Sequence, residues 1–376
     1  MTGPDRSRVG VDATPLATGH AIRGIGRYVG GILDAAGTAE PDWARTKLGL
    51  LLLKGQAAPI DAAVWRTRRS PIRPQDLDPV VSSVADRIAL RGRRPYAWHH
   101  TDPTNPWSPL PAERTIVTVY DLIPFREPTV MARIRPHRRF AYQRYLGLVR
   151  AAAGIVAISG TTAADVVELL GVPEERIRIV PPYVTSSVVG GTGSAEPVAR
   201  VPAMFLWVGI PEPHKRPLLA IDALGELVRR GVDAELAFAG VHPAPLRAQL
   251  RERVAAARLE SRVRYLDRID DADLTRRYAG SVLVATSSIE GFGLPLVEAI
   301  LAGGRVAATP TAAYRDAVGD VAMFAADASV GAVADAMDAA LGRLPSAADR
   351  ARLAERFGAP AVAAALLSAY RDLVRA

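Results

Sequence analysis

A strand, a glycine turn and a helix are predicted in direct succession over residues 281–299, and this segment limits the fold more than any other. Ser281–Thr286 is a short apolar run rich in β-branched residues, which is typical of a buried parallel strand. Gly291 and Gly293 allow the chain to turn sharply after it, and Pro295 suits the first turn of a helix. The first amides of such a helix attract phosphate or other anionic oxygens. The segment therefore predicts an α/β fold with a ligand site at the end of a strand.

Two carboxylates stand on either side of this turn. Glu290 falls in the loop and Glu298 about one turn into the helix, so both side chains can reach one ligand. Anionic oxygens at the amides and hydroxyl groups at the carboxylates indicate a sugar nucleotide. In the alternative interpretation, Glu298 is a solvated helix residue and the two glycines only form the turn.

Apolar runs alternate with helical patterns along the whole chain, and we expect each run to form a strand. The runs are residues 9–13, 48–53, 96–99, 116–120, 155–158, 177–180, 204–209, 235–240, 263–266, 281–286 and 305–309. This alternation predicts parallel sheets wrapped by helices, in which ligands bind beyond the carboxyl ends of the strands. With 376 residues, the chain is long for one core and sufficient for two domains.

The predicted fold class is therefore α/β, with two doubly wound domains. Residues 1–188 form the first domain and residues 203–357 the second. Residues 189–202 lose all periodicity and contain three glycines, so we expect a linker there. Residues 358–376 have the pattern of a terminal helix.

Composition excludes several classes of protein. Hydrophobic residues make up 49% and charged residues 23% of the chain, which excludes disorder as its main state. No apolar run approaches the ~20 residues of a membrane-spanning helix, and the N-terminal residues lack a signal-peptide core, so we expect a cytoplasmic location. The absence of cysteine excludes disulfides, thiolate catalysis and cysteine metal sites. No spacing of His, Asp and Glu indicates a metal site, and we expect no cofactor.

The net charge of +8 is concentrated in the first part of the chain, where residues 1–150 hold 23 basic and 13 acidic residues. Part of the excess belongs to a basic amphipathic helix expected after Pro136. Its arginines and neighbouring apolar residues are Arg133, Arg135, Arg138, Arg139, Arg144, Arg150, Phe140, Tyr142, Tyr145 and Leu146. Such a face suits anionic lipid headgroups, which would hold the protein at the inner face of the membrane, or a phosphate-bearing acceptor; a solvated helix face explains it equally well. Nucleic-acid binding is not expected, because no array of base-stacking aromatic residues accompanies the charge.

The segment Glu290–Ala299 resembles the E-x7-E signature of retaining glycosyltransferases of family 4. Further segments resemble this family in the expected order, and together they cover most of the chain. They are residues 24–29, 119–124, 158–160, 209–215 and 308–316. The resemblance implies the GT-B fold, in which two Rossmann-like domains face each other across a cleft and a terminal helix crosses back to the first domain.

The resemblance also implies roles for the two glutamates. Glu290 would contact the donor sugar, and Glu298 would hold the ribose hydroxyls of the nucleotide. The remaining residues of the motif would bind the donor between them; they are Gly291, Phe292, Gly293 and Leu294.

A second donor loop is implied at residues 209–216. From Gly209 it resembles the family's Gly-x-x-Glu-Pro-Arg-Lys-Asn loop without a gap, and Lys215 would neutralise the diphosphate. His214 stands in place of the family's arginine and Arg216 in place of its asparagine. We therefore expect Arg216 to supply the second cation.

The first half of the chain contributes two further motifs. Gly24 and Gly26 form a loop suited to close approach by phosphate or acceptor, and Asp12 either orients or caps it. Tyr120 stands where relatives commonly carry a histidine that points into the cleft, and tyrosine is a poor base near neutral pH. Asp121 is either an acceptor orienter or a loop cap.

Three histidines remain outside these motifs. His99 and His100 follow a predicted strand of the first half, and His242 follows a predicted strand of the second. We expect all three to be polar loop residues rather than catalysts.

The activity implied by this resemblance is that of a retaining glycosyltransferase. It would move a hexose, for which a mannosyl-like sugar is the first expectation, from a GDP- or UDP-linked donor. The acceptor would be a hydroxyl of a sugar, a lipid-linked molecule or a small molecule held by the N-terminal domain. The product would be an α-glycosidic bond in a cell-surface polysaccharide, a glycolipid or a natural-product glycoside, and no metal is implied. The alternative, motivated by Tyr120 and His214, is a catalytically weakened GT-B-like binding or partner subunit.

Overall fold

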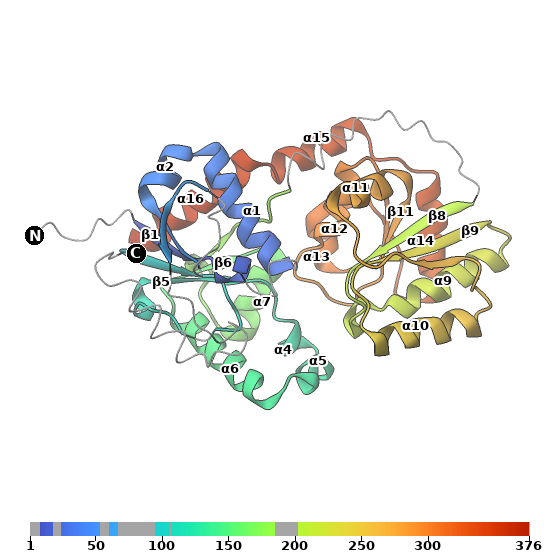
Figure 1. The fold of residues 1–376 in the computed structure, drawn as a ribbon, viewed down its shortest axis with the longest axis horizontal. Coiled ribbons are helices and arrows are strands. Elements are labelled where there is room, and N and C mark those ends of the chain that lie inside the picture. The colour runs from blue at the N-terminus through green and yellow to red at the C-terminus, as the bar shows by residue number, and fades with distance from the viewer. Residues whose placement is uncertain are drawn as a thin grey trace, which may run out of the picture. The chain divides into compact units, whose positions relative to one another are not determined.

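The computed structural model describes residues 8–17, 24–52, 60–66, 95–105, 107–184 and 202–375. The chain forms two compact units (Figure 1). Unit 1 comprises Met1–Tyr183 together with Arg356–Ala376, and unit 2 comprises Val184–Glu355. The predicted linker 189–202 lies outside the described residues except for Pro202.

Unit 1 is built on a parallel sheet with the strand order β3-β2-β1-β4-β5-β6-β7. The strands are β1 Val9–Asp12, β2 Leu48–Leu52, β3 Ala63–Arg66, β4 Ala97–His100, β5 Thr115–Val119, β6 Gly154–Ala157 and β7 Ile177–Ile179. Every residue of β1, β4, β5 and β6 is buried, as expected for a parallel sheet covered on both faces. From β1 the chain builds outward to β3 and then returns to place β4 on the other side of β1, so the strand order reverses between β1 and β4.

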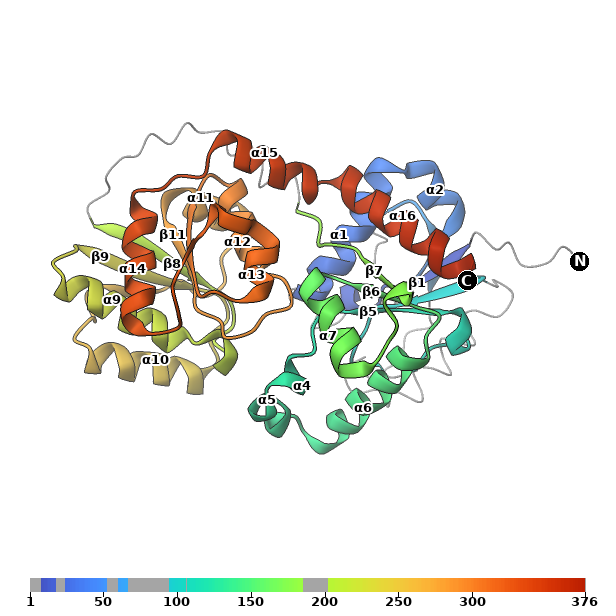
Figure 2. The same cartoon turned by 180° about the vertical axis from the view of Figure 1, so that it is seen from behind.

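The helices of unit 1 cover this sheet (Figures 1 and 2). They are α1 Gly24–Ala39, α2 Pro41–Lys47, α4 Ile123–Arg126, α5 Pro128–Arg133, α6 Pro136–Ala151, α7 Gly160–Leu170 and α16 Ala359–Arg375. Although α16 is the last helix of the chain, it packs along α1. Val362, Leu366 and Tyr370 recur every fourth residue on its buried face, and Asp372 accepts a hydrogen bond from Arg178 Nε at 2.9 Å. Among the helices of the described residues, none combines the length and apolar character needed to cross a membrane.

Unit 2 has a second parallel sheet with the strand order β10-β9-β8-β11-β12-β13. The strands are β8 Ala203–Val208, β9 Ala234–Ala239, β10 Val263–Tyr265, β11 Val282–Ala285, β12 Arg305–Ala308 and β13 Met323–Phe324. Its helices are α9 Pro217–Arg229, α10 Ala244–Ala256, α11 Asp271–Gly280, α12 Leu294–Leu301, α13 Ala312–Val318, α14 Val330–Leu341 and α15 Ala347–Arg356, the last of which ends at the first residue of the unit 1 segment. Here the strand order reverses between β8 and β11.

The prediction of two doubly wound α/β domains is confirmed, and each predicted apolar run overlaps a strand. Two further strands, β3 and β13, were not predicted. The helix predicted after Pro136 is α6.

Two local predictions in unit 1 are wrong. His99 and His100 are not loop residues, because they form the end of β4 and are 0% and 1% exposed. Gly24 and Gly26 are not in a loop, because they belong to the first turn of α1, which begins at Gly24. A β-carbon on Gly24 would meet no atom of the described residues within 4 Å, and the φ of Gly24 is not in the left-handed region.

Candidate functional site

Two loops meet at the edge of the unit 2 sheet where the strand order reverses. Residues 209–216 follow β8 and residues 286–293 follow β11, and these strands are parallel neighbours. The backbone amide of Ser288 donates to the His214 carbonyl at 2.7 Å, and the Ser288 hydroxyl donates to the same oxygen at 3.2 Å. The side chains of the two loops are therefore held in a fixed relation to each other.

Lys215 and Glu290 form an ion pair across these loops. Lys215 Nζ lies 2.6 Å from Glu290 Oε1, and the Ser287 hydroxyl donates to the same oxygen at 2.8 Å. The hydroxyl of Tyr314, from α13, donates in turn to Ser287 Oγ at 2.9 Å. The lysine and glutamate side chains keep 26% and 15% of their surface exposed, so a ligand can reach the pair. The structure thus brings together two of the predicted site residues.

The surroundings of Glu290 keep its carboxyl group ionised. Burial acts to raise the pKa of Glu290, but the charge of Lys215, the hydrogen bonds from Lys215 and Ser287 and the nearby His214 outweigh it, so the pKa lies below its ordinary value. Burial, followed by the charge of Glu290, raises the pKa of Tyr314 well above its ordinary value. The site therefore presents a carboxylate, an ammonium group and neutral hydroxyls, which can bind sugar hydroxyls and phosphate oxygens.

Gly293 makes the turn between this loop and α12 possible. It is the N-cap of α12 and has a φ of 109°, and a β-carbon there would lie 2.6 Å from Cδ1 of Tyr314. Leu294 begins the helix and Pro295 follows in its first turn, as predicted. Gly291 and Phe292 are buried in the same turn.

Glu298 lies in the body of α12 and is 3% exposed. Its Oε2 accepts a hydrogen bond from the Tyr278 hydroxyl of α11 at 3.2 Å. The alternative interpretation of Glu298 as a solvated helix residue is therefore wrong. Tyr278 orients the carboxylate, and a buried carboxylate held in this way is suited to a specific partner rather than to water.

The loop 209–216 holds its remaining predicted residues in distinct settings. Gly209 has a φ of 143° and donates its amide to Ala239 O at 3.0 Å, which ties the loop to β9. The His214 side chain is 9% exposed, and its Nε2 lies 3.6 Å from Glu212 Oε2. Arg216 is exposed, has a left-handed φ of 47° and forms the N-cap of α9. Its role as a second cation stays a prediction.

Tyr120 and Asp121 follow β5 in unit 1, and both have local partners. Tyr120 is 8% exposed, its hydroxyl donates to the Thr101 carbonyl at 2.8 Å, and its ring meets that of Tyr28 edge-on at 5.4 Å. Burial raises the pKa of Tyr120 well above its ordinary value, so the phenol stays neutral. Asp121 Oδ1 accepts from the amide of Ile123 at 3.1 Å, which favours the loop-cap interpretation. We infer that Tyr120 positions Thr101 rather than a ligand.

A group of residues near the ends of β9 and β10 was not predicted from the sequence. His242, expected to be a polar loop residue, is 7% exposed, and its ring meets those of Phe238 and Tyr265 edge-on at 6.3 and 6.2 Å. Within the described chain, neither ring nitrogen of His242 has a hydrogen-bond partner, and the same holds for the Tyr265 hydroxyl and Arg247 Nε. Burial, and then Arg247, lower the pKa of His242, which favours a neutral ring with one donor and one acceptor. The sequence signal was a histidine just after the end of a strand.

The described residues contain no group of three His, Cys, Asp or Glu side chains that could hold a metal ion.

Comparison with known proteins gives one family and several similar folds. Residues 196–356 match the family described as glycosyl transferases group 1. A phosphatidyl-myo-inositol mannosyltransferase of Mycobacterium tuberculosis is 35% identical over 111 residues, which is 29% of this chain and 28% of the length of that relative.

Solved structures of similar fold cover almost the whole chain. Sucrose-phosphate synthase from Thermosynechococcus elongatus has a TM-score of 0.74 at 17% identity, covering 98% of this chain and 99% of that one. A glycosyltransferase from Rickettsia africae ESF-5 has a TM-score of 0.68 at 14% identity, covering 99% of both chains. Anabaena HepE in complex with UDP and glucose has a TM-score of 0.66 at 15% identity, covering 96% of this chain and 98% of that one. The predicted GT-B fold is thus confirmed, and residues 196–356, which are less than half of the chain, match the glycosyl transferases group 1 family.

Proposed function

We propose that this protein is a retaining glycosyltransferase that takes a hexose from a nucleoside-diphosphate sugar and forms an α-glycosidic bond with an acceptor hydroxyl. The observation that carries the proposal is the Lys215–Glu290 ion pair at the edge where the strand order of unit 2 reverses. Ligands of open α/β sheets bind at this kind of edge. An ammonium group and a carboxylate there match the two ends of such a donor, its diphosphate and its sugar hydroxyls.

In the proposed reaction the donor separates the ion pair. Lys215 turns to the diphosphate, and Glu290 accepts hydrogen bonds from hydroxyls of the sugar. The bond between the anomeric carbon and the phosphate oxygen breaks as the acceptor oxygen attacks from the same face, and the acceptor proton passes to that leaving oxygen. Stabilising the charge that develops on the leaving diphosphate is the main task of the protein, and Lys215 and Arg216 perform it.

The donor is proposed to be UDP- or GDP-linked. Anabaena HepE is described with UDP and glucose, and the mycobacterial relative is described as a mannosyltransferase, so a hexose donor is the proposal that both support. The buried carboxylate of Glu298 would accept from the ribose hydroxyls. Polar atoms of His242, Tyr265 and Arg247 that have no hydrogen-bond partner among the described residues lie beside aromatic rings and would bind the edge of the base.

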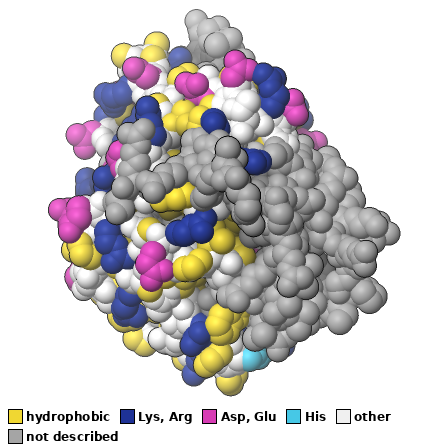
Figure 3. Space-filling view, turned by 90° about the vertical axis from the view of Figure 1, so that its left-hand side faces the viewer, with side chains coloured by type: hydrophobic (Ala, Val, Ile, Leu, Met, Phe, Trp, Pro, Cys, Tyr) yellow, Lys and Arg dark blue, Asp and Glu magenta, His cyan; other side chains and the backbone are white. Residues whose placement is uncertain are grey.

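The acceptor is proposed to bind unit 1 and to be a sugar, a lipid-linked molecule or a small molecule. A lipid-linked acceptor would agree with a peripheral position of the protein at an anionic membrane. Phe140 of α6 is 64% exposed and Phe125 of α4 is 41% exposed, and the exposed arginines of α6 include Arg138 and Arg139. On the described part of the face in Figure 3, basic side chains are dispersed among apolar and acidic ones, which suits loose attachment to headgroups better than tight binding of a polyanion.

The test is donor binding and turnover by Lys215→Ala and Glu290→Gln. UDP- or GDP-hexoses should raise the melting temperature of the wild type, and purified protein should release the nucleotide slowly by hydrolysis. We expect Lys215→Ala to lower kcat/KM by about 100-fold or more, the loss typical of one charge-stabilising group. Lys47→Ala, in α2 of unit 1, is the matched control. Wild-type donor affinity and turnover in Lys215→Ala would refute the site.

The second candidate function is a GT-B-like binding or partner subunit with little turnover. The setting of Tyr120 favours it, because the side chain in the place of the family's histidine gives its hydroxyl to the Thr101 carbonyl. Nucleotide sugars that raise the melting temperature without hydrolysis or transfer would establish this function instead.

A further inference from the structure

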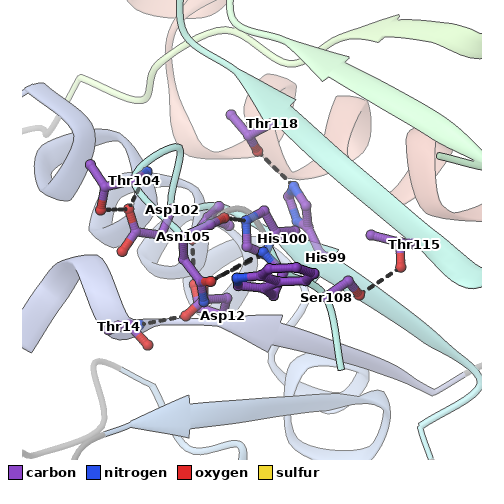
Figure 4. Close-up of polar contacts among 12 residues, drawn as sticks. Asp12, Thr14, His99, His100, Asp102, Thr104, Asn105, Ser108, Thr115 and Thr118 are labelled. Carbon is purple, nitrogen blue, oxygen red and sulfur yellow. Dashed lines mark hydrogen bonds and ion pairs between the residues drawn. The ribbon is translucent and has the colours of Figure 1, made fainter. Parts of the chain in front are cut away.

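A buried polar cluster lies at the edge of the unit 1 sheet where the strand order reverses (Figure 4). Asp12 is the last residue of β1, and His100 is the last residue of β4. The register pairs Val11 with His99, so Asp12 and His100 end side by side, and Asp102 follows two residues later. Asp12, His100 and Asp102 are 3%, 1% and 6% exposed, and we call these three side chains the Asp12 cluster.

The hydrogen bonds of His100 fix its tautomer. Nε2 lies 2.7 Å from the carbonyl oxygen of Asn105, and because a carbonyl can only accept, Nε2 carries the proton. In the neutral ring, Nδ1 is then a bare acceptor. Within the described chain Nδ1 has no hydrogen-bond partner, and the nearby carboxylate oxygen Oδ2 of Asp12 is 3.9 Å away, too far for a direct bond.

The carboxylates of the cluster also have acceptor capacity to spare. Asp12 Oδ1 accepts from the amide of Thr14 at 3.0 Å, and its Oδ2 faces His100. Asp102 Oδ1 accepts from both the amide and the hydroxyl of Thr104, at 2.9 and 2.6 Å. These bonds orient both side chains through one oxygen, and no described residue donates a hydrogen bond to the other oxygen of each.

The nearby hydroxyl donors are committed elsewhere. The Thr101 hydroxyl donates to the carbonyl of Asp12, and the Tyr120 hydroxyl donates to the carbonyl of Thr101. With a neutral His100 ring, the cluster therefore offers three acceptors and, among the described residues, no uncommitted hydroxyl donor. An acceptor buried without a donor costs free energy, and a donor-rich ligand removes that cost.

We propose that the Asp12 cluster binds adjacent hydroxyl groups of a polyol or sugar, which donate to His100 Nδ1 and to the free oxygens of Asp12 and Asp102. Two acceptors 3.9 Å apart suit neighbouring hydroxyls, because each hydroxyl has one proton to give. The assignment of this ligand as the acceptor substrate rests on the proposed function, whereas binding of the polyol does not. Burial raises the pKa of Asp12, and a donor hydroxyl would relieve the same cost.

Substitution of His100 by glutamine or by asparagine separates this proposal from a structural role, because each amide replaces one of the two ring nitrogens. His100→Gln places its amide near the position of Nε2 and keeps a donor for Asn105 O, but it lacks the acceptor at Nδ1. His100→Asn places its amide near Nδ1 and keeps an acceptor there, but it lacks the Nε2 donor. A structural role needs the bond to Asn105, and a ligand role needs Nδ1.

The experiment measures binding of D-mannose and myo-inositol to the full chain by saturation-transfer NMR, with cyclohexanol as the probe that has one hydroxyl. We expect the wild type to bind at least one of the two polyols and not cyclohexanol. His100→Gln and Asp102→Asn should weaken binding about tenfold or more, whereas His100→Asn stays within about threefold. Asp42→Asn, at an exposed position of α2, is the surface control. If His100→Gln does not fold, the less buried Asp102→Asn decides.

Several outcomes would overturn the proposal: no polyol binding by the wild type, equal binding of cyclohexanol, or equal polyol affinity in the wild type, His100→Gln and Asp102→Asn. Nucleotide-sugar binding by the wild type separates the two proposals of function. If polyol binding follows the expected pattern while nucleotide sugars fail to bind the wild type, the polyol site stands and the glycosyltransferase activity fails. If nucleotide sugars bind and the polyols do not, the reverse holds.

Discussion

The carboxylate of Glu290 is surrounded by groups that favour its charged form. Lys215 and Ser287 both donate to Oε1, and the pKa of Glu290 lies below its ordinary value. A group whose pKa is depressed by folding stabilises the folded state at pH values above its unfolded pKa, and that stabilisation is lost as the pH falls through the folded pKa. The ion pair is thus a source of stability near neutral pH as well as the proposed donor site.

This linkage gives a prediction for Glu290→Gln. The variant should be less stable than the wild type at pH 7, and the difference should shrink as the pH falls below about 4, near the unfolded pKa of glutamate. Urea unfolding of both proteins at pH 7, 5 and 3.5 measures it. A difference in the free energy of unfolding that stays constant over this range would contradict the linkage.

Gly293 allows a backbone effect and a packing effect to be separated. Gly293→Ala should lose about 1–3 kcal/mol from its φ of 109°, and the contact of its new β-carbon with Tyr314 should add to the loss. Gly303 has a φ of 85°, and no atom of the described residues lies within 4 Å of a β-carbon built there, so Gly303→Ala should show the backbone cost alone. Urea unfolding compares the two, and equal losses would show that Tyr314 moves aside freely.

The predictability of the site from sequence differs from residue to residue. Lys215 and Glu290 could be paired because both follow predicted strands in motifs of one family, and neighbouring parallel strands end at the same edge. His100 and His242 were missed because a histidine near a strand end is usually solvated, and burial depends on rings and strands distant in sequence. The hydroxyl direction of Tyr120 depends on Thr101, which no pattern around Tyr120 indicates.

At the scale of elements, β4, β5 and α16 are joined through one buried histidine. His99 Nδ1 lies 2.7 Å from the Tyr370 hydroxyl of α16, and Nε2 lies 2.7 Å from Thr118 Oγ1 of β5. The Tyr370 ring also stacks on Trp43 at 5.9 Å. Burial, and then His100, lower the pKa of His99 to about 3. The neutral ring therefore holds the terminal helix against the sheet.

Acid should weaken this connection. The unfolded chain binds a proton at His99 below pH ~6.5, whereas the folded chain does not until the pH is near 3. The free energy of unfolding should therefore decrease as the pH is lowered through that window, by at most ~1.4 kcal/mol per pH unit. His99→Gln should flatten the slope, and His137→Gln, at an exposed position of α6, should not. Urea unfolding at pH 7, 6, 5 and 4 gives the slopes. Equal slopes in all three proteins would refute the role of His99.

The elements themselves were largely predictable, and the exceptions have physical causes. Runs such as Val282–Ala285 are apolar on both faces because helices cover both sides of a parallel sheet. The two-residue β13 is too short to show any period. A loop was predicted at the first turn of α1 because Gly24 and Gly26 disfavour a helix. Packing of the rest of α1 overrides that preference.

At the scale of the whole molecule, the charge of +8 and the exposed aromatic residues of unit 1 bear on membrane attachment. We expect Phe140→Ser to weaken binding to phosphatidylserine vesicles about tenfold, because an exposed phenylalanine gains ~1.5–3 kcal/mol on burial in lipid. Val241→Ser, an exposed apolar position of unit 2 at 48% exposure, is the control. Co-sedimentation measures the binding, which should also weaken with salt. Equal binding by all three proteins would exclude α6 as the attachment face.

The return of α16 to unit 1 sets an order of events during synthesis. Unit 2 is one continuous stretch, Val184–Glu355, and all of it has left the ribosome before the final segment emerges. Unit 2 interrupts unit 1 in the sequence, so α1 cannot pack against α16 until residues 359–375 have been translated. The domain made first is thus the domain completed last, and a nascent chain carries the unfinished surface of α1 throughout the synthesis of its other half.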